Sequence, residues 1–347
     1  MLSRTLCHLK TAKGLNAKTV IAQAEQTQAE QTQAEQTQAE QTQAKQTQAK
    51  QTQAEQQSHD EYQYLHLIQD ILNYGTMETG RNGLVKTVFG SAMHFQLNDN
   101  TIPLLTTKQV AWKTCLKELF WFIQGGTDNS MLNAQNVHIW DGNASREFLD
   151  ERGLIHLAEN DLGPVYGHQW RHFNAPYSTC KEDYAGKGID QLGYIIASLS
   201  NPETRNSRRL VMSAWNPCQL NEMALPPCHV LCQFNVVEGN KLSCSLYQRS
   251  GDVGLGVPFN IASYSFLTHL IANHCGLIAT EFIYYLGNSH IYDDHLLALE
   301  SQLLNKPLPF PKIKIKTVRD SFEEYTMDDV EIIDYTSHGK IKMEMRK

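Results

Sequence analysis

A pentad repeat limits which part of this chain can build a hydrophobic core. Residues 24–53 hold six copies of a five-residue unit, Ala-Glu-Gln-Thr-Gln four times and then twice with lysine at positions 45 and 50. A step of five residues turns a helix about 140° beyond a full turn, so no apolar stripe forms. The unit also has no large apolar residue and cannot bury a core. We therefore predict a low-complexity tail over residues 1–57, disordered or loosely helical, and a folded domain over residues 58–347.

The segment before the repeat is basic. Residues 1–23 contain Arg4, Lys10, Lys13 and Lys18 and no acidic residue, with leucines spaced among them. This is a weak match to an organelle transit peptide. An ordinary basic start of a dispensable tail is the interpretation that we favour. We therefore expect a cytoplasmic location and keep an organelle as the alternative.

Composition excludes several classes of protein. The chain has 347 residues, of which 41% are hydrophobic, enough for one large domain or two ordinary ones. The formal charge of -7 argues against a general polyanion surface, so nucleic-acid binding is not indicated and any anion site must be local. No apolar run approaches the roughly 20 residues of a membrane span. The eight cysteines include no CxxC pair, so we expect reduced thiols and neither a metal site nor a disulfide framework.

Apolar periodicity and chain breakers outline the folded part. Ser58 and Glu61 have the spacing of a capping box, and the helix after them is expected to end at Gly75. Further helices are expected at 107–124, 189–200, 260–275 and 293–305, and strands at 209–215, 228–237, 242–248, 279–286 and 311–317. Helices and strands do not alternate strictly. The prediction is therefore an α+β domain with helices covering a mixed, twisted sheet.

Cys228 is the candidate nucleophile. It follows Pro226-Pro227 at the start of an apolar, strand-like run. A lone cysteine in a strand is usually buried and inert. The two prolines fix the backbone before it, however, and arginines that lie close in the fold favour the thiolate form. The sequence alone does not show that proximity.

Four arginines are candidates for binding a phosphate group. Arg208 and Arg209 open an apolar run. Adjacent arginines usually lie on a solvated edge, but successive strand residues face opposite sides, so one of the two could be partly buried. Arg249 is followed by Ser250, and a guanidinium fork beside a hydroxyl suits a phosphate. Arg81 lies in a glycine-flanked loop that can close over an anion. Each arginine taken alone is more often a surface residue.

Glu118 shares a helix face with Cys115, Trp121 and Phe122, its neighbours at i−3, i+3 and i+4. Burial among such side chains raises the pKa of a carboxyl group, which makes it a candidate for catalysis. A solvent-facing acid beside Lys117 is the alternative.

Asn260 follows Pro258-Phe259 and is expected to cap the helix after it. Its amide offers a donor and an acceptor together, which alternatively matches the edge of uracil. Cytosine presents the opposite pattern and favours an aspartate.

His290 and Tyr292 lie on one side of an extended segment and could bind a sugar hydroxyl, a structural pair being the alternative. The aromatic residues Tyr166 and Trp140 are further candidates, although an aromatic residue in a turn ordinarily serves packing.

The segments Pro226-Pro227-Cys228-His229, Tyr247-Gln248-Arg249-Ser250 and Pro258-Phe259-Asn260 closely resemble thymidylate synthase, the folate-dependent family that methylates deoxyuridylate. The resemblance covers about residues 60–347. It implies the α+β fold of that family, a methyltransferase of dTMP biosynthesis, and dUMP and folate as partners.

The resemblance implies a role for each candidate. Catalysis is assigned to Cys228, which adds to carbon 6 of uracil, and to Glu118 with Tyr166, which move protons. Contacts with dUMP are assigned to Arg81, Arg249 and Ser250 at the phosphate, Arg208 and Arg209 donated across a homodimer, Asn260 at the base, and His290 and Tyr292 at the ribose. Trp140 and Asp252 are assigned to the folate, and Asp252 is grouped with the dUMP-binding residues as well.

The implied chemistry needs one co-substrate. Thiolate addition makes carbon 5 of uracil a nucleophile. In the family, 5,10-methylenetetrahydrofolate supplies both the carbon and the hydride and leaves as dihydrofolate. No nicotinamide and no metal are therefore expected, and the chain has no GxGxxG motif.

The chain departs from the family pattern in three places. Position 251 is a glycine where relatives often carry a larger residue. The Arg81 loop is about one residue shorter and lacks a second glycine. The last residues are Met345-Arg346-Lys347, where the family has small apolar residues in a tail that folds over the folate.

Four alternatives remain open. A folate enzyme of the reductase type is disfavoured because no nucleotide-phosphate loop appears. A deoxycytidylate hydroxymethylase of the same fold is disfavoured by Asn260. A nucleotide- or RNA-binding regulator without turnover is disfavoured by the joint presence of Cys228, Glu118 and Asn260. The pentad tail could instead be the functional part, tethering the enzyme to a partner.

Overall fold

The computed structural model describes residue 26, residues 59–80 and residues 82–346. The chain divides between His59 and Asp60, and the part from Asp60 onward contains a six-stranded and a two-stranded sheet. The described residues do not include residues 1–25 and 27–58, which contain the pentad tract apart from Gln26. They also do not include Arg81 or Lys347. The predicted tail and its boundary at residues 57–58 therefore stay predictions.

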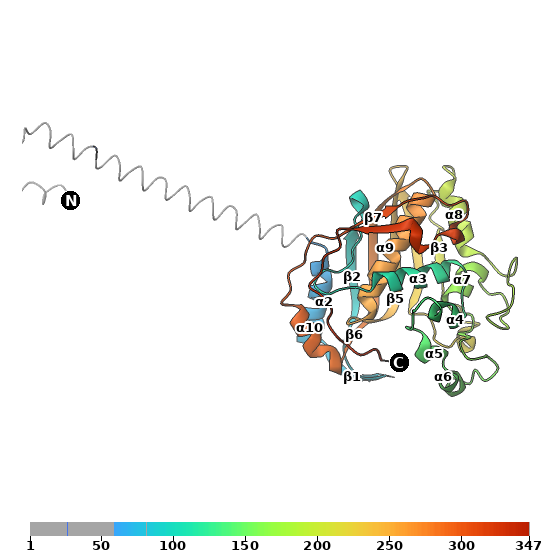
Figure 1. Cartoon of the computed structure of the whole chain (residues 1–347), viewed down its shortest axis with the longest axis horizontal. Helices are drawn as coiled ribbons and strands as arrows, with labels where there is room; N and C mark the ends of the chain where they lie inside the picture. Colours follow the sequence, from blue (N-terminus) through green and yellow to red (C-terminus); the bar gives the residue numbers. More distant parts are fainter. Residues whose placement is uncertain (1–25, 27–58, 81, 347) are drawn as a thin grey trace, which may run out of the picture. The chain divides into compact units, whose positions relative to one another are not determined.

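The six-stranded sheet forms the framework of the domain (Figure 1), with the strand order β1-β2-β6-β5-β4-β3. Its strands are β1 (Thr76–Gly80), β2 (Gly83–Gln96), β3 (Val211–Ser213), β4 (His229–Val237), β5 (Lys241–Asp252) and β6 (Ile278–Tyr292). Neighbouring strands are antiparallel except β5 and β6, which are parallel. The sheet is mixed, so the predicted α+β class is confirmed. The two-stranded sheet pairs β7 (Lys312–Ile315) with β8 (Val330–Ile333).

Helices cover one face of the large sheet. The buried helix α9 (Gly256–His274) packs on β5 and β6, α2 (Glu61–Tyr74) packs on β2, and α3 (Trp112–Ile123) packs on α9. Figure 1 shows α3 and α9 on the same side of the strands. The remaining helices are α4 (Asn129–Asn133), α5 (Asp141–Ala144), α6 (Arg146–Glu151), α7 (Tyr166–His172), α8 (Gln191–Ser200) and α10 (Leu296–Gln302), with the short 3-10 turn η4 (Asp293–His295) directly after β6.

The other face of the sheet carries a row of exposed apolar side chains. Leu231 pairs with Tyr247, and Tyr247 pairs with Tyr285, so the three lie side by side across β4, β5 and β6. They are 37%, 40% and 44% exposed, whereas their neighbours in sequence Leu246 and Tyr284 are fully buried. Because side chains alternate between the faces of a strand, the row lies on the face opposite α9.

Two helices begin later in the chain than predicted. The helix α2 begins at Glu61 with Asp60 before it, and Ser58, the other residue of the predicted capping box, lies outside the described residues. The Glu61 carboxylate accepts hydrogen bonds from the backbone and hydroxyl groups of Thr106 and Thr107, at 2.6–3.0 Å. The predicted start of α3 at residue 107 is wrong, because residues 106–109 form a turn and the helix starts at Trp112. Its predicted end before Gly125 is confirmed.

The strands β1 and β2 were not predicted. The burial of β2 alternates only in parts, and Gly90 interrupts the strand with a φ of 85°. The strand is therefore set by its pairing with β6 and not by a clear pattern of its own.

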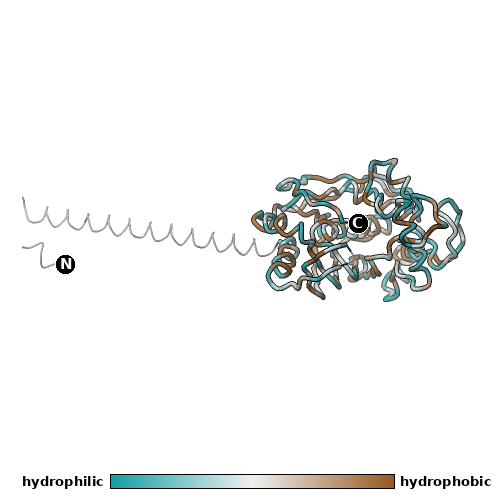
Figure 2. The backbone as a smooth tube through the Cα atoms, turned by 90° about the horizontal axis from the view of Figure 1, so that it is seen from below, coloured by the Kyte–Doolittle hydropathy of each residue, from teal (hydrophilic) through white to brown (hydrophobic). Residues whose placement is uncertain are grey.

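No helix in the described part of the chain is long and apolar enough to cross a bilayer. Figure 2 shows apolar stretches that are short and alternate with polar ones along the backbone.

Candidate active site

Cys228 lies immediately before β4, at the end of the Pro226-Pro227 turn. Its backbone N–H donates a 2.7 Å hydrogen bond to the hydroxyl oxygen of Tyr166, the first residue of α7. Its carbonyl accepts a 2.9 Å bond from the backbone N–H of Arg249 in β5. This half-buried cysteine is therefore held in place from both a helix and a strand.

The side chain of Arg249 closes the same turn. Its Nε donates to the carbonyl of Pro227 at 2.9 Å and its Nη2 to the carbonyl of Pro226 at 2.8 Å, while the guanidinium lies 5.6 Å from the ring centre of Trp215. The tertiary structure thus places an arginine next to the residues that precede Cys228. A guanidinium has five N–H donors, so donors remain for an anion.

Glu118 is buried in α3, as its apolar neighbours predict. Burial raises the pKa of its carboxyl group to about 7, against the opposing effect of a hydrogen bond from Trp140. That bond runs from the indole Nε1 to Oε1 of Glu118 at 2.7 Å. The predicted direction of the pKa shift is confirmed.

Tyr166 connects the acid to the cysteine. Burial raises the pKa of its hydroxyl well above the ordinary value, and the charges of Cys228 and Glu118 add to the rise. Its ring centre lies 6.2 Å from that of Trp140. The three titratable groups of Cys228, Tyr166 and Glu118 therefore share one electrostatic neighbourhood.

Asn260 lies inside α9, four residues after its start, and not at its N-terminal cap. The predicted capping role is wrong, because the helix already begins at Gly256. Its amide is buried, and the hydroxyl of Tyr284 lies 3.5 Å from its Oδ1 and donates to Oε1 of Gln248 at 2.6 Å.

His229 was not among the predicted site residues. It follows Cys228 and is buried, and burial lowers the pKa of its imidazole to about 4, although a hydrogen bond with Asn260 opposes the shift. It pairs across β4 and β5 with Gln248, another buried polar residue that sequence reasoning missed. The sequence did hold a signal for His229, since it is a polar residue in an apolar strand and directly follows the candidate nucleophile.

Asp252, His290 and Tyr292 meet where β5 and β6 end. Asp252 is paired with His290 in the parallel register, and its Oδ1 accepts a 2.8 Å bond from the backbone N–H of Gly254. The rings of His290 and Tyr292 lie edge to face, 5.3 Å apart, which agrees with their predicted placement on one side of a strand. Burial lowers the pKa of His290.

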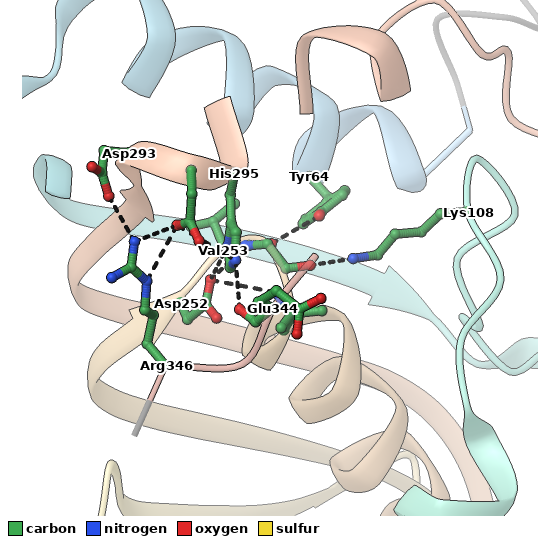
Figure 3. Close-up of polar contacts among 11 residues, drawn as sticks. Tyr64, Lys108, Asp252, Val253, Asp293, His295, Glu344 and Arg346 are labelled. Atoms are coloured by element: carbon green, nitrogen blue, oxygen red, sulfur yellow. Dashed lines mark hydrogen bonds and ion pairs between the residues drawn. The ribbon is translucent and has the colours of Figure 1, made fainter. Parts of the chain in front are cut away.

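Side chains from distant segments bind the turn that follows Asp252, at Val253 and Gly254 (Figure 3). The Tyr64 hydroxyl donates to the carbonyl of Val253 at 2.8 Å, and the buried ammonium of Lys108 donates to the carbonyl of Gly254. Burial lowers the pKa of Lys108 to about 8, while the nearby Asp252 charge opposes the shift. Sequence reasoning missed both residues. The lysine stands in a stretch that is otherwise mostly apolar or hydroxylic, and that was its only signal.

The remaining arginines do not join this cluster. Arg208 and Arg209 are both exposed in a turn before β3, as the solvated-edge interpretation predicts, and neither is partly buried in a strand. The carbonyl of Arg208 accepts a hydrogen bond from the side chain of Gln233, and the backbone N–H of Arg209 donates to the hydroxyl oxygen of Ser207. Arg81 lies outside the described residues. Ser250 follows Arg249 in β5 and is half-buried.

Among the residues that the structure describes, no group of three or more His, Cys, Asp or Glu side chains could hold a metal ion.

Comparison with known proteins shows one family. The family model described as thymidylate synthase matches residues 62–347. A thymidylate synthase of human herpesvirus 8 is 51% identical over 288 residues, covering 83% of this chain and 84% of the viral protein. A bifunctional dihydrofolate reductase-thymidylate synthase of Leishmania amazonensis is 51% identical over 292 residues, covering 83% of this chain and 56% of the relative. A bifunctional relative from Arabidopsis thaliana is 48% identical, with 83% and 55% covered. The chain thus spans about half the length of these bifunctional relatives.

Proposed function

Because the chain belongs to the thymidylate synthase family, we propose that it catalyses the reductive methylation of dUMP to dTMP. In this proposal 5,10-methylenetetrahydrofolate donates the carbon and the hydride and leaves as dihydrofolate, as part of de novo dTMP biosynthesis. One observation carries the proposal: Cys228 is fixed between Tyr166 and Arg249, and the charge of the buried acid Glu118 acts on the same tyrosine.

We assign Cys228 as the nucleophile. Its thiolate adds to carbon 6 of the uracil ring, which forms a carbon–sulfur bond and shifts electron density onto carbon 5. The guanidinium of Arg249, held against the carbonyls of Pro226 and Pro227, places a positive charge beside the turn that carries the thiol. A nearby cation favours the thiolate over the thiol.

Glu118 and Tyr166 are suited to moving protons. With a pKa of about 7, the Glu118 carboxyl is present in both protonation states near neutral pH, as a general acid or base requires. Tyr166 keeps its proton, because burial raises the pKa of its hydroxyl. We assign removal of the carbon 5 proton to this pair.

Asn260 is suited to reading the edge of uracil. An amide offers an acceptor and a donor side by side, which complements the N–H and carbonyl of the base. His229, whose pKa is about 4, is a neutral imidazole at physiological pH and adds no charge next to the base. The surroundings of Asn260 therefore favour hydrogen bonding over ion pairing.

Further side chains are assigned to the nucleotide. Arg249 and Ser250, with Arg81, bind the phosphate, while His290 and Tyr292 bind the ribose hydroxyl. Asp252 lies next to His290 in the register of β5 and β6 and is grouped with them.

Trp140 and Asp252 fit a folate. Trp140 offers an aromatic ring whose N–H already binds the buried acid Glu118. Asp252 offers a half-buried carboxylate, an acceptor for the N–H groups of a pterin. When bound, the folate supplies the one-carbon unit and the hydride. The part played by these residues is to hold and orient it.

A homodimer accounts for two features of the single chain. The apolar row Leu231, Tyr247 and Tyr285 on the open face of the sheet has no described helix over it, and a second copy would bury it. Arg208 and Arg209 are exposed instead of joining the cluster at Cys228. We propose that each chain donates these two arginines to the phosphate site of the other.

The test is spectrophotometric. Purified protein is mixed with dUMP and 5,10-methylenetetrahydrofolate, and the absorbance rise of dihydrofolate is followed alongside the Cys228→Ala variant. A rise that needs both substrates and is lost in the variant supports the proposal. A folded dimer that binds dUMP without any rise contradicts it.

We also propose a cytoplasmic location, with an organelle as the alternative. Fluorescent fusions with and without residues 1–23 distinguish the two.

A further inference from the structure

The C-terminal segment lies against the turn where β5 and β6 end. The guanidinium of Arg346 contacts both acids of η4, with Nη2 at 3.0 Å from Oδ1 of Asp293 and 2.9 Å from Oδ1 of Asp294. Figure 3 shows this side chain pointing at Asp293. The same guanidinium lies 5.7 Å from the ring centre of Tyr292. Its Nη1 lies so close to Gly83 that a β-carbon there would be 3.4 Å away.

Two other contacts hold the segment, and neither of them is an ion pair. The buried His295 donates through Nε2 to the carbonyl of Glu344 at 2.8 Å, and its Nδ1 lies 3.9 Å from Asp252. The sulfur of Met343 lies 3.1 Å from where a β-carbon of Gly254 would be. The segment therefore lies beside Tyr292, which is assigned to the nucleotide, and beside Gly254 in the turn after Asp252, and Arg346 makes its ion pairs to the acidic turn.

We propose that Arg346 and the acidic pair Asp293–Asp294 form an ionic latch that positions residues 343–346 over the site. The three residues act through the segment and are positioning residues, not catalytic ones. The effect on catalysis rests on the proposed function, but the latch itself is a property of the unliganded chain.

The exposure of the latch predicts its response to salt. The side chains of Arg346, Asp293 and Asp294 are 34%, 44% and 39% exposed. Ion pairs with this much solvent contact are weak and screened by salt. The hydrogen bond from Arg346 is the largest cause of the lowered pKa of Asp294. The latch is thus strong enough to bias the position of the segment and weak enough to release it.

Hydrogen exchange of the unliganded protein tests the latch directly. In Asp293→Asn/Asp294→Asn, which keeps the shape of both side chains, amides of residues 340–346 exchange about 3- to 10-fold faster, the range open to exposed ion pairs. Raising the salt from about 0.1 M to about 1 M shortens the Debye length from about 10 Å to about 3 Å and speeds exchange in the wild type but not in this variant. Unchanged exchange in the variant overturns the proposal.

A matched ion pair supplies the control. Lys187 pairs with Glu182 at 2.6 Å, with similar exposure, and its ammonium lies 5.4 Å from the ring centre of Tyr184. Glu182→Gln therefore removes the same kind of contact elsewhere and leaves exchange of residues 340–346 unchanged. If it speeds their exchange equally, a general loss of stability explains the result and the latch is wrong.

Charge exchange and kinetics complete the test. Arg346→Asp speeds hydrogen exchange of residues 340–346. Adding Asp294→Arg reverses the charges of the pair and restores slow exchange, a rescue that is not expected if Arg346 acts only through its size and packing. In the turnover assay, Asp293→Asn/Asp294→Asn raises KM for 5,10-methylenetetrahydrofolate about 3- to 10-fold with a smaller change in kcat. If the wild type shows no turnover while the exchange pattern holds, the proposed function fails and the latch stands.

Discussion

The indole N–H of Trp140 donates a 2.7 Å hydrogen bond to the carboxylate of Glu118, 22 positions earlier in the chain. The bond favours the ionised form of an acid that burial drives toward its neutral form, and the balance leaves the pKa at about 7. A buried carboxyl group that titrates near neutral pH can take up and release protons in turnover.

The pKa of Glu118 predicts how stability depends on pH. The pKa rises from 4.5 to about 7 on folding, so the folded state holds the proton more tightly. Its contribution to stability is complete below about pH 4.5 and is lost as the pH rises through about 7, by on the order of 3 kcal/mol in full. We expect the Tm of Glu118→Gln to rise relative to wild type between about pH 5 and about pH 8. The exposed Glu147→Gln is the control, and an equal pH dependence of Glu118→Gln and wild type contradicts the prediction.

Tyr166→Phe removes the acceptor for the backbone N–H of Cys228. We expect the free energy of unfolding to fall by about 1–2 kcal/mol, because a donor that is partly buried loses its partner. We also expect the alkylation rate of the Cys228 thiol to change, since the turn is less fixed. Chemical denaturation and iodoacetamide labelling measure the two effects, with the exposed Tyr74→Phe as control. If the free energy of unfolding and the alkylation rate both stay at their wild-type values, the hydrogen bond contributes neither to stability nor to the position of Cys228.

Arg249→Lys keeps the charge but loses the planar fork that binds the carbonyls of Pro226 and Pro227. We expect KM for dUMP to rise at least about tenfold, because lysine cannot hold the turn and a phosphate at once. Arg205→Lys is the matched control, since Arg205 also donates to two backbone carbonyls, those of Gly239 and Ser200. The assignment of Arg249 is wrong if both variants behave alike.

Asn260→Asp tests the reading of the base. A carboxylic acid beside the base reverses the donor and acceptor pattern and suits cytosine better than uracil. We expect the preference for dUMP over dCMP, measured as the ratio of kcat/KM values, to fall at least about 100-fold. The exposed Asn235→Asp should leave the ratio unchanged. A preference that persists in Asn260→Asp moves base recognition to another residue.

Arg208→Gln/Arg209→Gln tests donation across the dimer. Mixed with Cys228→Ala and allowed to exchange subunits, it forms heterodimers in which one of two sites is intact, so activity returns to roughly a quarter of wild type at equal amounts. Each variant alone is inactive. A mixture that stays inactive, although size and mass analysis show heterodimers, argues against donation between subunits.

Some features of the candidate site were predictable because their signals are local. The diproline before Cys228 and the apolar neighbours of Glu118 act within one turn or one helix face. The structure confirms the burial of Glu118 and the common side of His290 and Tyr292. Local signals say nothing of distant partners: the carboxylate of Glu61, expected to serve in a capping box, binds Thr106 and Thr107.

The apolar content and the order of helical and strand-like segments were enough to predict the mixed character of the sheet, while the candidate site residues were assigned mainly from the resemblance of short motifs to a known family. Which of those residues meet became clear from the folded domain alone. The contact of Arg249 with the turn before Cys228, the neutral His229, and the ion pairs of Arg346 with Asp293 and Asp294 join residues far apart in the chain or depend on burial. Ion pairs and pKa values depend on distance and solvent exposure, and the order of residues specifies neither.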